Sequence, residues 1–307
     1  MKNIDCFIYE AIKKGFNIDS VCVQTPNSLQ FAGNNNIINV HSAAKTITSL
    51  AFALFLKEYR QISISDKIIS FFPEYNSCLS KNTEYITIRD LLHMQSGKYI
   101  QSLFQKNIKQ DWNQDWAKWF FEYPVESLPG TYYYYSSHCC YMIGRIIAKI
   151  SQVDVNDFLE DRLWRPLAIN KPFWSKCPAG YTNCAGNLMI KCTDLAKIGW
   201  TILNKGEYNS IDLNMERNYV ENMYTDIVCS SDPFGWNDEE CNCGYGYFLW
   251  RCKGNKRFRI WGAGGNFSVI DFPTNKCITI TAIRDEVNWK SHNDQDLLRL
   301  IVKMFLT

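Results

Sequence analysis

The pattern of apolar and polar positions predicts strands at both ends of the chain and helices between them. Near the N-terminus, residues 4–15 have a helical repeat, and residues 19–33 predict two strands joined by a turn at Pro26-Asn27-Ser28. Near the C-terminus, alternating apolar residues predict further strands and a closing helix. These elements are the strands 244–252, 257–265, 267–273 and 277–285 and the helix 294–306.

The middle of the chain is predominantly helical. Helical periodicity covers 43–59, 87–97, 115–123, 138–152 and 192–206. The sequence contains no internal repeat and no low-complexity linker. One sheet would therefore combine strands from both chain ends, with the helices inserted between them. We expect an α/β (α+β) fold with a discontinuous domain of residues 1–65 and 240–307 and a mainly helical inserted domain of residues 66–239.

Composition is that of a globular protein of ordinary charge. Of the 307 residues, 46% are hydrophobic and 21% are charged, which excludes a disordered chain. The formal net charge of +2 gives no electrostatic reason to expect a nucleic-acid or anionic membrane partner. There is no apolar stretch of about 20 residues that would span a bilayer, and the N-terminus does not resemble a signal peptide. We therefore expect a cytoplasmic protein, and the sequence leaves its oligomeric state open.

The chain has 13 scattered cysteines, an odd number. In a cytoplasmic protein of this size we expect them to be free thiols that pack as small hydrophobic residues. Cys241, Cys243 and Cys252 are close in sequence, but C-x-C is not zinc-finger spacing and no second ligand pair follows. We expect no metal and no organic cofactor.

Ser42 and Lys45 begin a long apolar helical segment, "SAAKTITSLAFALFL". Positions i and i+3 share one helix face, about 5–6 Å apart. A helix N-terminus also supplies unpaired N–H groups and positive partial charge, which favour an anion formed when a serine attacks a carbonyl. A neutral lysine amine within reach of a hydroxyl can take its proton. The alternative is that Ser42 only caps the helix and Lys45 is a solvated residue of its first turn.

Several segments, in order, resemble the serine β-lactamase and penicillin-binding-protein-like hydrolases. The similarity is greatest to the branch of class C β-lactamases, esterases and D-aminopeptidases, and it runs from about residue 35 to 285. The segments that carry it are S-A-A-K, "ITIRDLLHMQSG", "LPGTYYYYSSHCCYMIG", "LWRPLAI", "AGNLMIKCTDLAKIGW" and "YGYFLW" with "WGAGGNFSVIDFP". The resemblance implies a central antiparallel sheet flanked by helices, with an all-helical domain inserted.

The same resemblance implies a role for three residues. Ser42 matches the acylated nucleophile, Lys45 matches its base, and Tyr135 matches the tyrosine of the family's Tyr-x-Asn motif, which can shuttle a proton. The alternative for the run Tyr132–Tyr135 is an aromatic strand or cleft wall.

Two motifs depart from the family pattern. Ser137 replaces the asparagine of Tyr-x-Asn and can still donate one hydrogen bond to substrate or to Lys45. The last motif is Gly262-Ala263-Gly264-Gly265, where β-lactamases have Lys-Thr-Gly and many esterases have His-x-Gly. Without that cation or imidazole, β-lactam hydrolysis is disfavoured.

The glycines of the last motif keep a possible binding role. They would let a substrate lie against the backbone at Gly264 and Gly265, and the Gly265 N–H would form an oxyanion hole with that of Ser42. With Asn266, this segment resembles the Gly-x-Gly-Gly-Gln variant of the nylon-oligomer hydrolase branch.

The histidines and the remaining motifs give weaker indications of function. His138 follows Tyr135 by three residues and could approach the cleft, but a packing role is the alternative. We expect His41 to be structural and His93 to lie in the core. No serine lies in a G-x-S-x-G elbow, and the glycine-rich segment lacks the ending of a phosphate-binding loop.

We therefore expect an esterase- or amidase-like serine hydrolase that acts on a small-molecule ester or amide. The alternatives are an acyltransferase on the same fold, a sensor that is acylated without turnover, and a non-catalytic relative.

Overall fold

The computed structural model describes residues 4–100, 115–230, 239, 243–254, 256–283 and 294–306. Its helices are α1 Ile4–Lys13, α2 Ala44–Glu58, α3 Ile88–Leu92, α4 Trp116–Glu122, α5 Ser137–Ser151, α6 Val155–Leu159, α7 Cys192–Leu203, α8 Arg217–Thr225 and α9 Asp294–Phe305. Its strands are β1 Ile18–Thr25, β2 Ser28–Gly33, β3 Ile38–Asn39, β4 Phe173–Trp174, β5 Leu188–Ile190, β6 Glu207–Tyr208, β7 Ile211–Asp212, β8 Tyr245–Gly246, β9 Leu249–Arg251, β10 Arg257–Gly262, β11 Asn266–Asp271 and β12 Lys276–Ala282.

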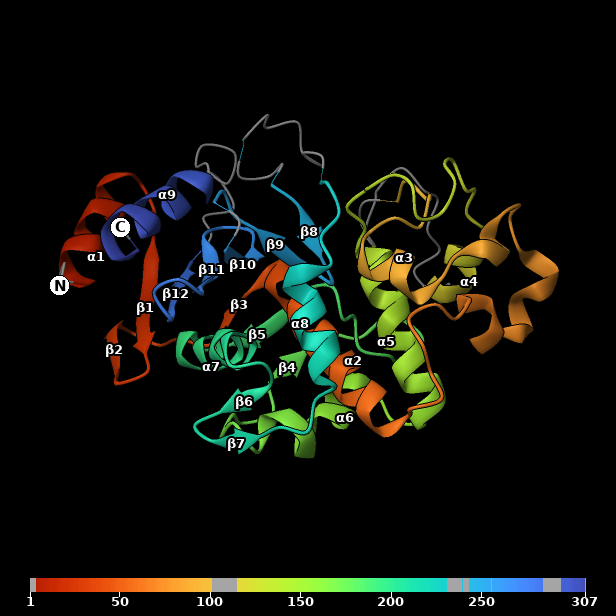
Figure 1. Ribbon diagram of the computed structural model, residues 1–307, viewed down its shortest axis with the longest axis horizontal. Helices are drawn as coiled ribbons and strands as arrows, with labels where there is room; N and C mark the ends of the chain where they lie inside the picture. Colours follow the sequence, from red (N-terminus) through yellow and green to blue (C-terminus); the bar gives the residue numbers. More distant parts are fainter. Residues whose placement is uncertain are drawn as a thin grey trace.

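A seven-stranded sheet joins the two ends of the chain (Figure 1). Its strand order in the described residues is β2-β1-β12-β11-β10-β9-β8, and the paired strands run antiparallel. The chain ends meet where Ile18 of β1 lies opposite Ala282 of β12. This confirms the expected α/β fold class with a central antiparallel sheet.

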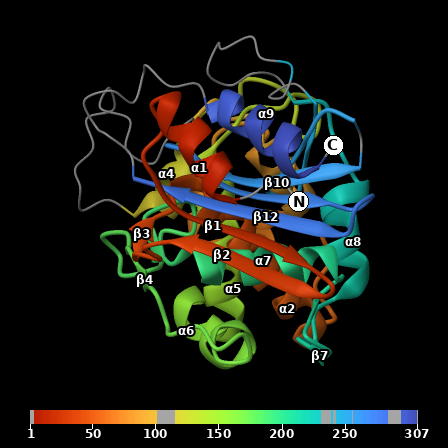
Figure 2. The same cartoon turned by 90° about the vertical axis from the view of Figure 1, so that its left-hand side faces the viewer.

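Helices cover both faces of the sheet (Figures 1 and 2). On one face, α1 and α9 lie side by side, and the rings of Phe7 and Phe305 are 5.2 Å apart. On the other face, α7 packs against β1, β11 and β12. It comes close because Gly199 has no side chain: a Cβ there would lie 2.2 Å from Ser268 Oγ.

Helix α2 is the buried centre of the helical part (Figure 1). Every residue from Ala44 to Phe55 is buried, and α5, α6 and α8 pack around the helix. A helix buried on all sides needs no polar face, which explains the nearly continuous apolar sequence. The few polar residues of this segment, Lys45, Thr46, Thr48 and Ser49, therefore need partners inside the protein.

Two predicted elements differ from the structure. The predicted strand 244–252 is a hairpin of β8 and β9, because Tyr247 and Phe248 form a two-residue turn. The predicted helix 87–97 is helical only at Ile88–Leu92, where a Thr87–Asp90 capping box starts it. The domain boundaries at 65/66 and 239/240 stay a prediction, although they assign α7, which packs on the sheet, to the helical insert.

The cysteines in the described part of the chain are free thiols, as expected. Two of them, Cys22 and Cys192, come within 3.9 Å, Sγ to Sγ. Among the described helices, none is long and apolar enough to cross a membrane.

Candidate active site

Ser42 lies in a short 3-10 turn, His41–Ala43, that leads directly into α2. The N-cap of α2 is Ala43, and no side chain caps it. The turn begins with His41 at φ 48°, an uncommon conformation for a residue with a side chain. Asn39 holds it, because its Oδ1 accepts the His41 N–H at 2.9 Å and its Nδ2 donates to Asn187 Oδ1 at 3.1 Å. Because no side chain caps α2, the Ser42 hydroxyl does not serve as its cap.

Lys45 is buried and points to Ser42. Its Nζ lies 2.9 Å from Ser42 Oγ and 2.7 Å from the carbonyl oxygen of Ala185, and the residue is only 1% exposed. None of the ion pairs between described residues involves Lys45. The alternative of a solvated first-turn lysine does not fit this position.

Tyr135 completes the group expected from the sequence. Its ring centroid lies 5.0 Å from Lys45 Nζ. The ring stacks on Trp250, with centroids 5.7 Å apart, and meets the edge of Tyr245 at 6.2 Å. The preceding Tyr134 stacks on Tyr99 instead. The structure thus brings Ser42, Lys45 and Tyr135 together from two separate segments.

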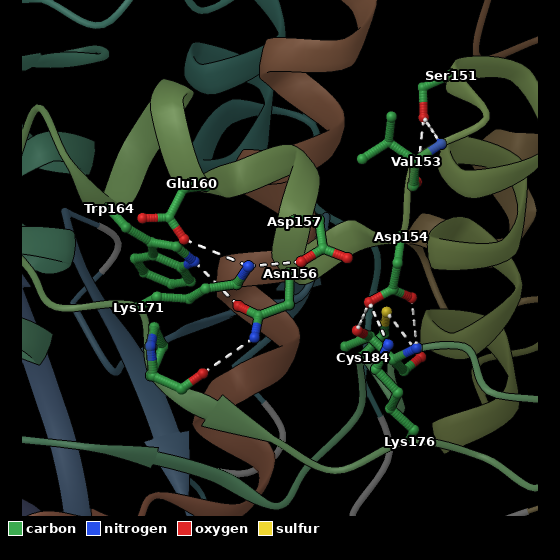
Figure 3. Close-up of polar contacts among 12 residues, drawn as sticks. Ser151, Val153, Asp154, Asn156, Asp157, Glu160, Trp164, Lys171, Lys176 and Cys184 are labelled. Carbon is green, nitrogen blue, oxygen red and sulfur yellow. Dashed lines mark hydrogen bonds and ion pairs between the residues drawn. The ribbon is translucent and has the colours of Figure 1, made fainter.

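The segment that supplies the Ala185 carbonyl is anchored by side chains. Asp154, just before α6, accepts the N–H and the hydroxyl of Thr182 at 2.7 and 2.5 Å. Figure 3 shows Asp154 beside Cys184. Asn183 Oδ1 then accepts the Ala185 N–H at 3.1 Å. Sequence reasoning matched this segment to the family but missed Ala185, since every residue has a carbonyl and no side chain marks this one.

The glycine-rich turn between β10 and β11 lies next to the turn that contains Ser42, through Gly262. A Cβ on Gly262 would be 1.9 Å from the Val40 oxygen and 3.1 Å from the Ala43 nitrogen. The next glycine of the turn makes a different contact: the Gly264 N–H donates to Asp294 Oδ2 at 3.1 Å. A Cβ on Gly265 would lie 3.0 Å from Leu297 on α9 and 3.2 Å from the Ala282 Cβ on β12.

Asn266 holds the same turn through a hydrogen bond from its side chain. It is fully buried, its Nδ2 donates to the Ala263 oxygen at 3.0 Å, and its Oδ1 accepts the Ala282 N–H at 3.3 Å. The amide side chain is thus engaged with the backbone. The sequence predicted an oxyanion or substrate contact at Gly264, Gly265 and Asn266, and that prediction remains untested.

Ser137 and the histidines have different positions. Ser137 is the first residue of α5 and is half-buried. His138 is fully buried edge-on to Trp119, with ring centroids 4.4 Å apart, and burial lowers its pKa to about 3. His93 is also buried, and its Nε2 lies 2.9 Å from the Asp226 carbonyl oxygen. His41 contributes through its backbone, as described above.

No group of three or more metal-ligating side chains occurs among the described residues. Of the cysteines considered as ligands, Cys241 lies outside the described residues.

A family model described as Beta-lactamase matches residues 32–303, which include Ser42, Lys45, Tyr135 and the turn after Gly262. The chain belongs to the β-lactamase family. Comparison with curated proteins finds no significant match.

Solved structures of the β-lactamase and penicillin-binding-protein type have the same fold. A Bacteroides dorei DSM 17855 protein classed provisionally as a β-lactamase has a TM-score of 0.77 and 16% identity, covering 98% of this chain and 97% of that one. D-amino acid amidase from Ochrobactrum anthropi SV3 has a TM-score of 0.74 and 14% identity, covering 98% and 96%. The octameric penicillin-binding protein homologue from Pyrococcus abyssi has a TM-score of 0.73 and 17% identity, covering 99% and 76%. At these identities the likeness concerns the β-lactamase fold.

Proposed function

We propose that this member of the β-lactamase family is a serine hydrolase that cleaves an ester or amide through an acyl-enzyme. The observation that carries the proposal is the position of Lys45 Nζ, 2.9 Å from Ser42 Oγ and 5.0 Å from the Tyr135 ring centroid. Nucleophile, base and proton shuttle are therefore adjacent before any substrate binds.

The proposed reaction has two halves. The Lys45 amine takes the Ser42 proton while Ser42 Oγ bonds to the carbonyl carbon, and the Ala185 carbonyl orients the amine by accepting a hydrogen bond from its N–H. The tetrahedral intermediate then expels an alcohol or amine, which leaves with a proton delivered through Tyr135. Water attacks the acyl-serine, a proton returns to Ser42, and the carboxylic acid is released.

Backbone N–H groups would hold the oxyanion. We propose the Ser42 N–H and the Ala263 N–H, because Ala263 directly follows the glycine that touches the nucleophile's turn. The Gly265 N–H, the donor expected from the sequence, is the other candidate from this turn. One such donor contributes roughly 10²–10³ in rate. Ser137 is proposed to donate a hydrogen bond to the substrate.

The proposed substrates are small esters or linear amides, in preference to β-lactams. The turn after β10 has no lysine or histidine to bind a substrate carboxylate. The fold shared with a D-amino acid amidase supports an amide bond as one target. Free buried thiols also support the proposed cytoplasmic location.

Covalent labelling tests the proposal. The protein is treated with a fluorophosphonate and, separately, with p-nitrophenyl acetate, and its intact mass is measured. We expect one adduct on the wild type and none on Ser42→Ala or Lys45→Ala. Lys98→Met is the matched control, because Lys98 is also a buried lysine but belongs to another cluster. An unlabelled wild type, or an adduct that persists in Ser42→Ala, would exclude the mechanism.

The fate of the acyl group distinguishes the hydrolase from the acyltransferase and from the sensor that is acylated without turnover. Steady release of acetate and p-nitrophenol supports a hydrolase. Transfer to an added alcohol or amine at the expense of hydrolysis would indicate an acyltransferase. A single stoichiometric burst without turnover would indicate an acyl sensor, an outcome for which Ser137 in place of asparagine gives a reason.

A further inference from the structure

The hairpin of β8 and β9 has an unfavourable sequence at its tip. Tyr247 and Phe248 have φ values of 40° and 64°, the positive pair that a type I′ turn requires. Such turns normally contain Asn-Gly, because most side chains disfavour positive φ. Here both residues are aromatic and buried, with exposed fractions of 0% and 1%. Other contacts must therefore impose this conformation on the tip.

Two side chains hold the tip, one from α2 and one from the residue that follows α8. Thr46 of α2 donates its hydroxyl to the Phe248 carbonyl oxygen at 2.6 Å. The Tyr247 hydroxyl donates to Asp226 Oδ2 at 2.9 Å, and Asp226 is itself paired with Arg89 at 2.7 Å. The first contact fixes the hairpin backbone, and the second fixes a side chain.

The hairpin supports Tyr135. Its two strands carry Tyr245 and Trp250, opposite each other in register, and both rings contact Tyr135. Thr46 follows Lys45 directly on α2. The Thr46–Phe248 hydrogen bond therefore ties the support of the tyrosine to the helix that carries the lysine.

We propose that Thr46 is a positioning residue, which sets the Tyr135 ring relative to Lys45 by locking the strained tip of the β8–β9 hairpin to α2. The proposal rests on the proposed function, since it gives the geometry of the Ser42, Lys45 and Tyr135 group a structural origin. Thr46 itself contacts no reacting atom in this scheme. A displacement of about 1 Å at such a group can lower the rate on the order of 10²-fold.

The test compares Thr46→Val with Thr46→Ser, using p-nitrophenyl acetate turnover and the fluorophosphonate labelling rate. Valine keeps the shape and removes the hydroxyl, and serine restores the hydroxyl. We expect Thr46→Val to lower kcat and the labelling rate by about 10–100-fold, with KM within about 3-fold of wild type. We expect Thr46→Ser to recover to within about 3-fold of wild type.

Thr279→Val is the matched control for a loss of stability alone, because it makes the same change at another buried threonine. Thr279 lies on β12, is fully buried, and its hydroxyl lies 2.8 Å from Ser268 Oγ on the neighbouring β11, three strands from β9 in the sheet order. We expect Thr279→Val to lower the Tm at least as much as Thr46→Val while keeping kcat within about 2-fold of wild type.

Three results would overturn the inference: Thr46→Val with wild-type kcat, equal losses of kcat in Thr46→Val and Thr279→Val, or no recovery in Thr46→Ser. These results require a wild type that is labelled at Ser42. A wild type that is not labelled would instead overturn the proposed function.

Discussion

Gly262 lies so close to Val40 that no side chain fits between them. A Cβ on Gly262 would be 1.9 Å from the Val40 carbonyl oxygen, well inside any allowed contact. The end of β10 therefore packs directly on the backbone turn that presents Ser42. Contact between two backbones makes the position of the serine sensitive to one methyl group.

Gly262→Ala is expected to displace the turn around Ser42 and to lower the rate of fluorophosphonate labelling at least about 100-fold. Gly186→Ala is the control, because a Cβ there would lie at an ordinary 3.7 Å from the His41 oxygen on the same turn. We expect the control to label within about 3-fold of wild type. Wild-type labelling of Gly262→Ala would show that the turn tolerates the displacement.

Asn266→Asp is expected to disturb the proposed oxyanion turn. The substitution removes the Asn266 Nδ2 group, which donates a hydrogen bond to the Ala263 carbonyl oxygen. It places a carboxylate oxygen against that carbonyl oxygen instead. The loss of this buried hydrogen bond should destabilise the fold by about 1–3 kcal/mol, measured by urea unfolding, and kcat should fall about 10–100-fold. Asn275→Asp, the same change in an exposed turn, should leave both quantities nearly unchanged. An unchanged kcat in Asn266→Asp would show that this turn takes no part in the proposed reaction.

His138 is expected to make the protein acid-sensitive. Burial lowers its pKa from 6.5 to about 3, so between these values the unfolded chain binds a proton that the folded protein does not. Stability from this group is complete above about pH 6.5 and is lost as pH falls, by at most about 1.4 kcal/mol per pH unit. Urea unfolding at pH 6.5 and 5.0 should show wild type losing about 2 kcal/mol more than His138→Leu. Equal losses would mean that His138 is protonated without unfolding.

Lys98 is expected to make the stability of the protein depend on pH in the alkaline range. Its Nζ donates to Ser80 Oγ at 3.0 Å, to Thr83 Oγ1 at 2.8 Å and to the Tyr123 carbonyl oxygen, and burial lowers its pKa from 10.5 to about 7. Above pH 7 the unfolded chain retains a proton that the folded protein releases.

Stability should therefore rise with pH from about 7 to 10.5, by at most about 1.4 kcal/mol per pH unit. Urea unfolding at pH 7 and 9 should show this rise in wild type and not in Lys98→Met. The exposed Lys67 provides the control: Lys67→Met should keep the wild-type rise. A rise of the same size in Lys98→Met would exclude Lys98 as its source.

The sequence predicted the local parts of the candidate site better than the distant ones. Ser42 and Lys45 are three residues apart at a helix start, so helix geometry alone brings their side chains together. Tyr135 required the family resemblance, because nothing local to residues 132–135 distinguishes one tyrosine of that run. The structure distinguishes it through Lys45, whose Nζ lies 5.0 Å from the Tyr135 ring centroid, whereas Trp250 and Tyr245 also contact Tyr133.

Contacts made by the backbone were the least predictable. The Ala185 carbonyl binds Lys45, yet a carbonyl leaves no mark in a sequence. Among four residues of the glycine-rich turn, only the packed structure shows that Gly262 touches the turn that contains Ser42. Tyr247 and Phe248 look like strand residues, since their own preferences oppose the turn that Thr46 and Asp226 impose.

The pairing of β1 with β12 has a consequence for the order of folding. Ile18 and Ala282 are partners, so β1 and β12 cannot pair until the chain has been synthesised as far as residue 282. Contacts between such distant parts of a chain slow folding and leave unpaired edges exposed in the meantime. Ser42 and Lys45 leave the ribosome early, whereas Trp250 and the turn after Gly262 leave late. Between the synthesis of Ser42 and that of Trp250, the growing chain thus carries the proposed nucleophile without the groups that would make it reactive.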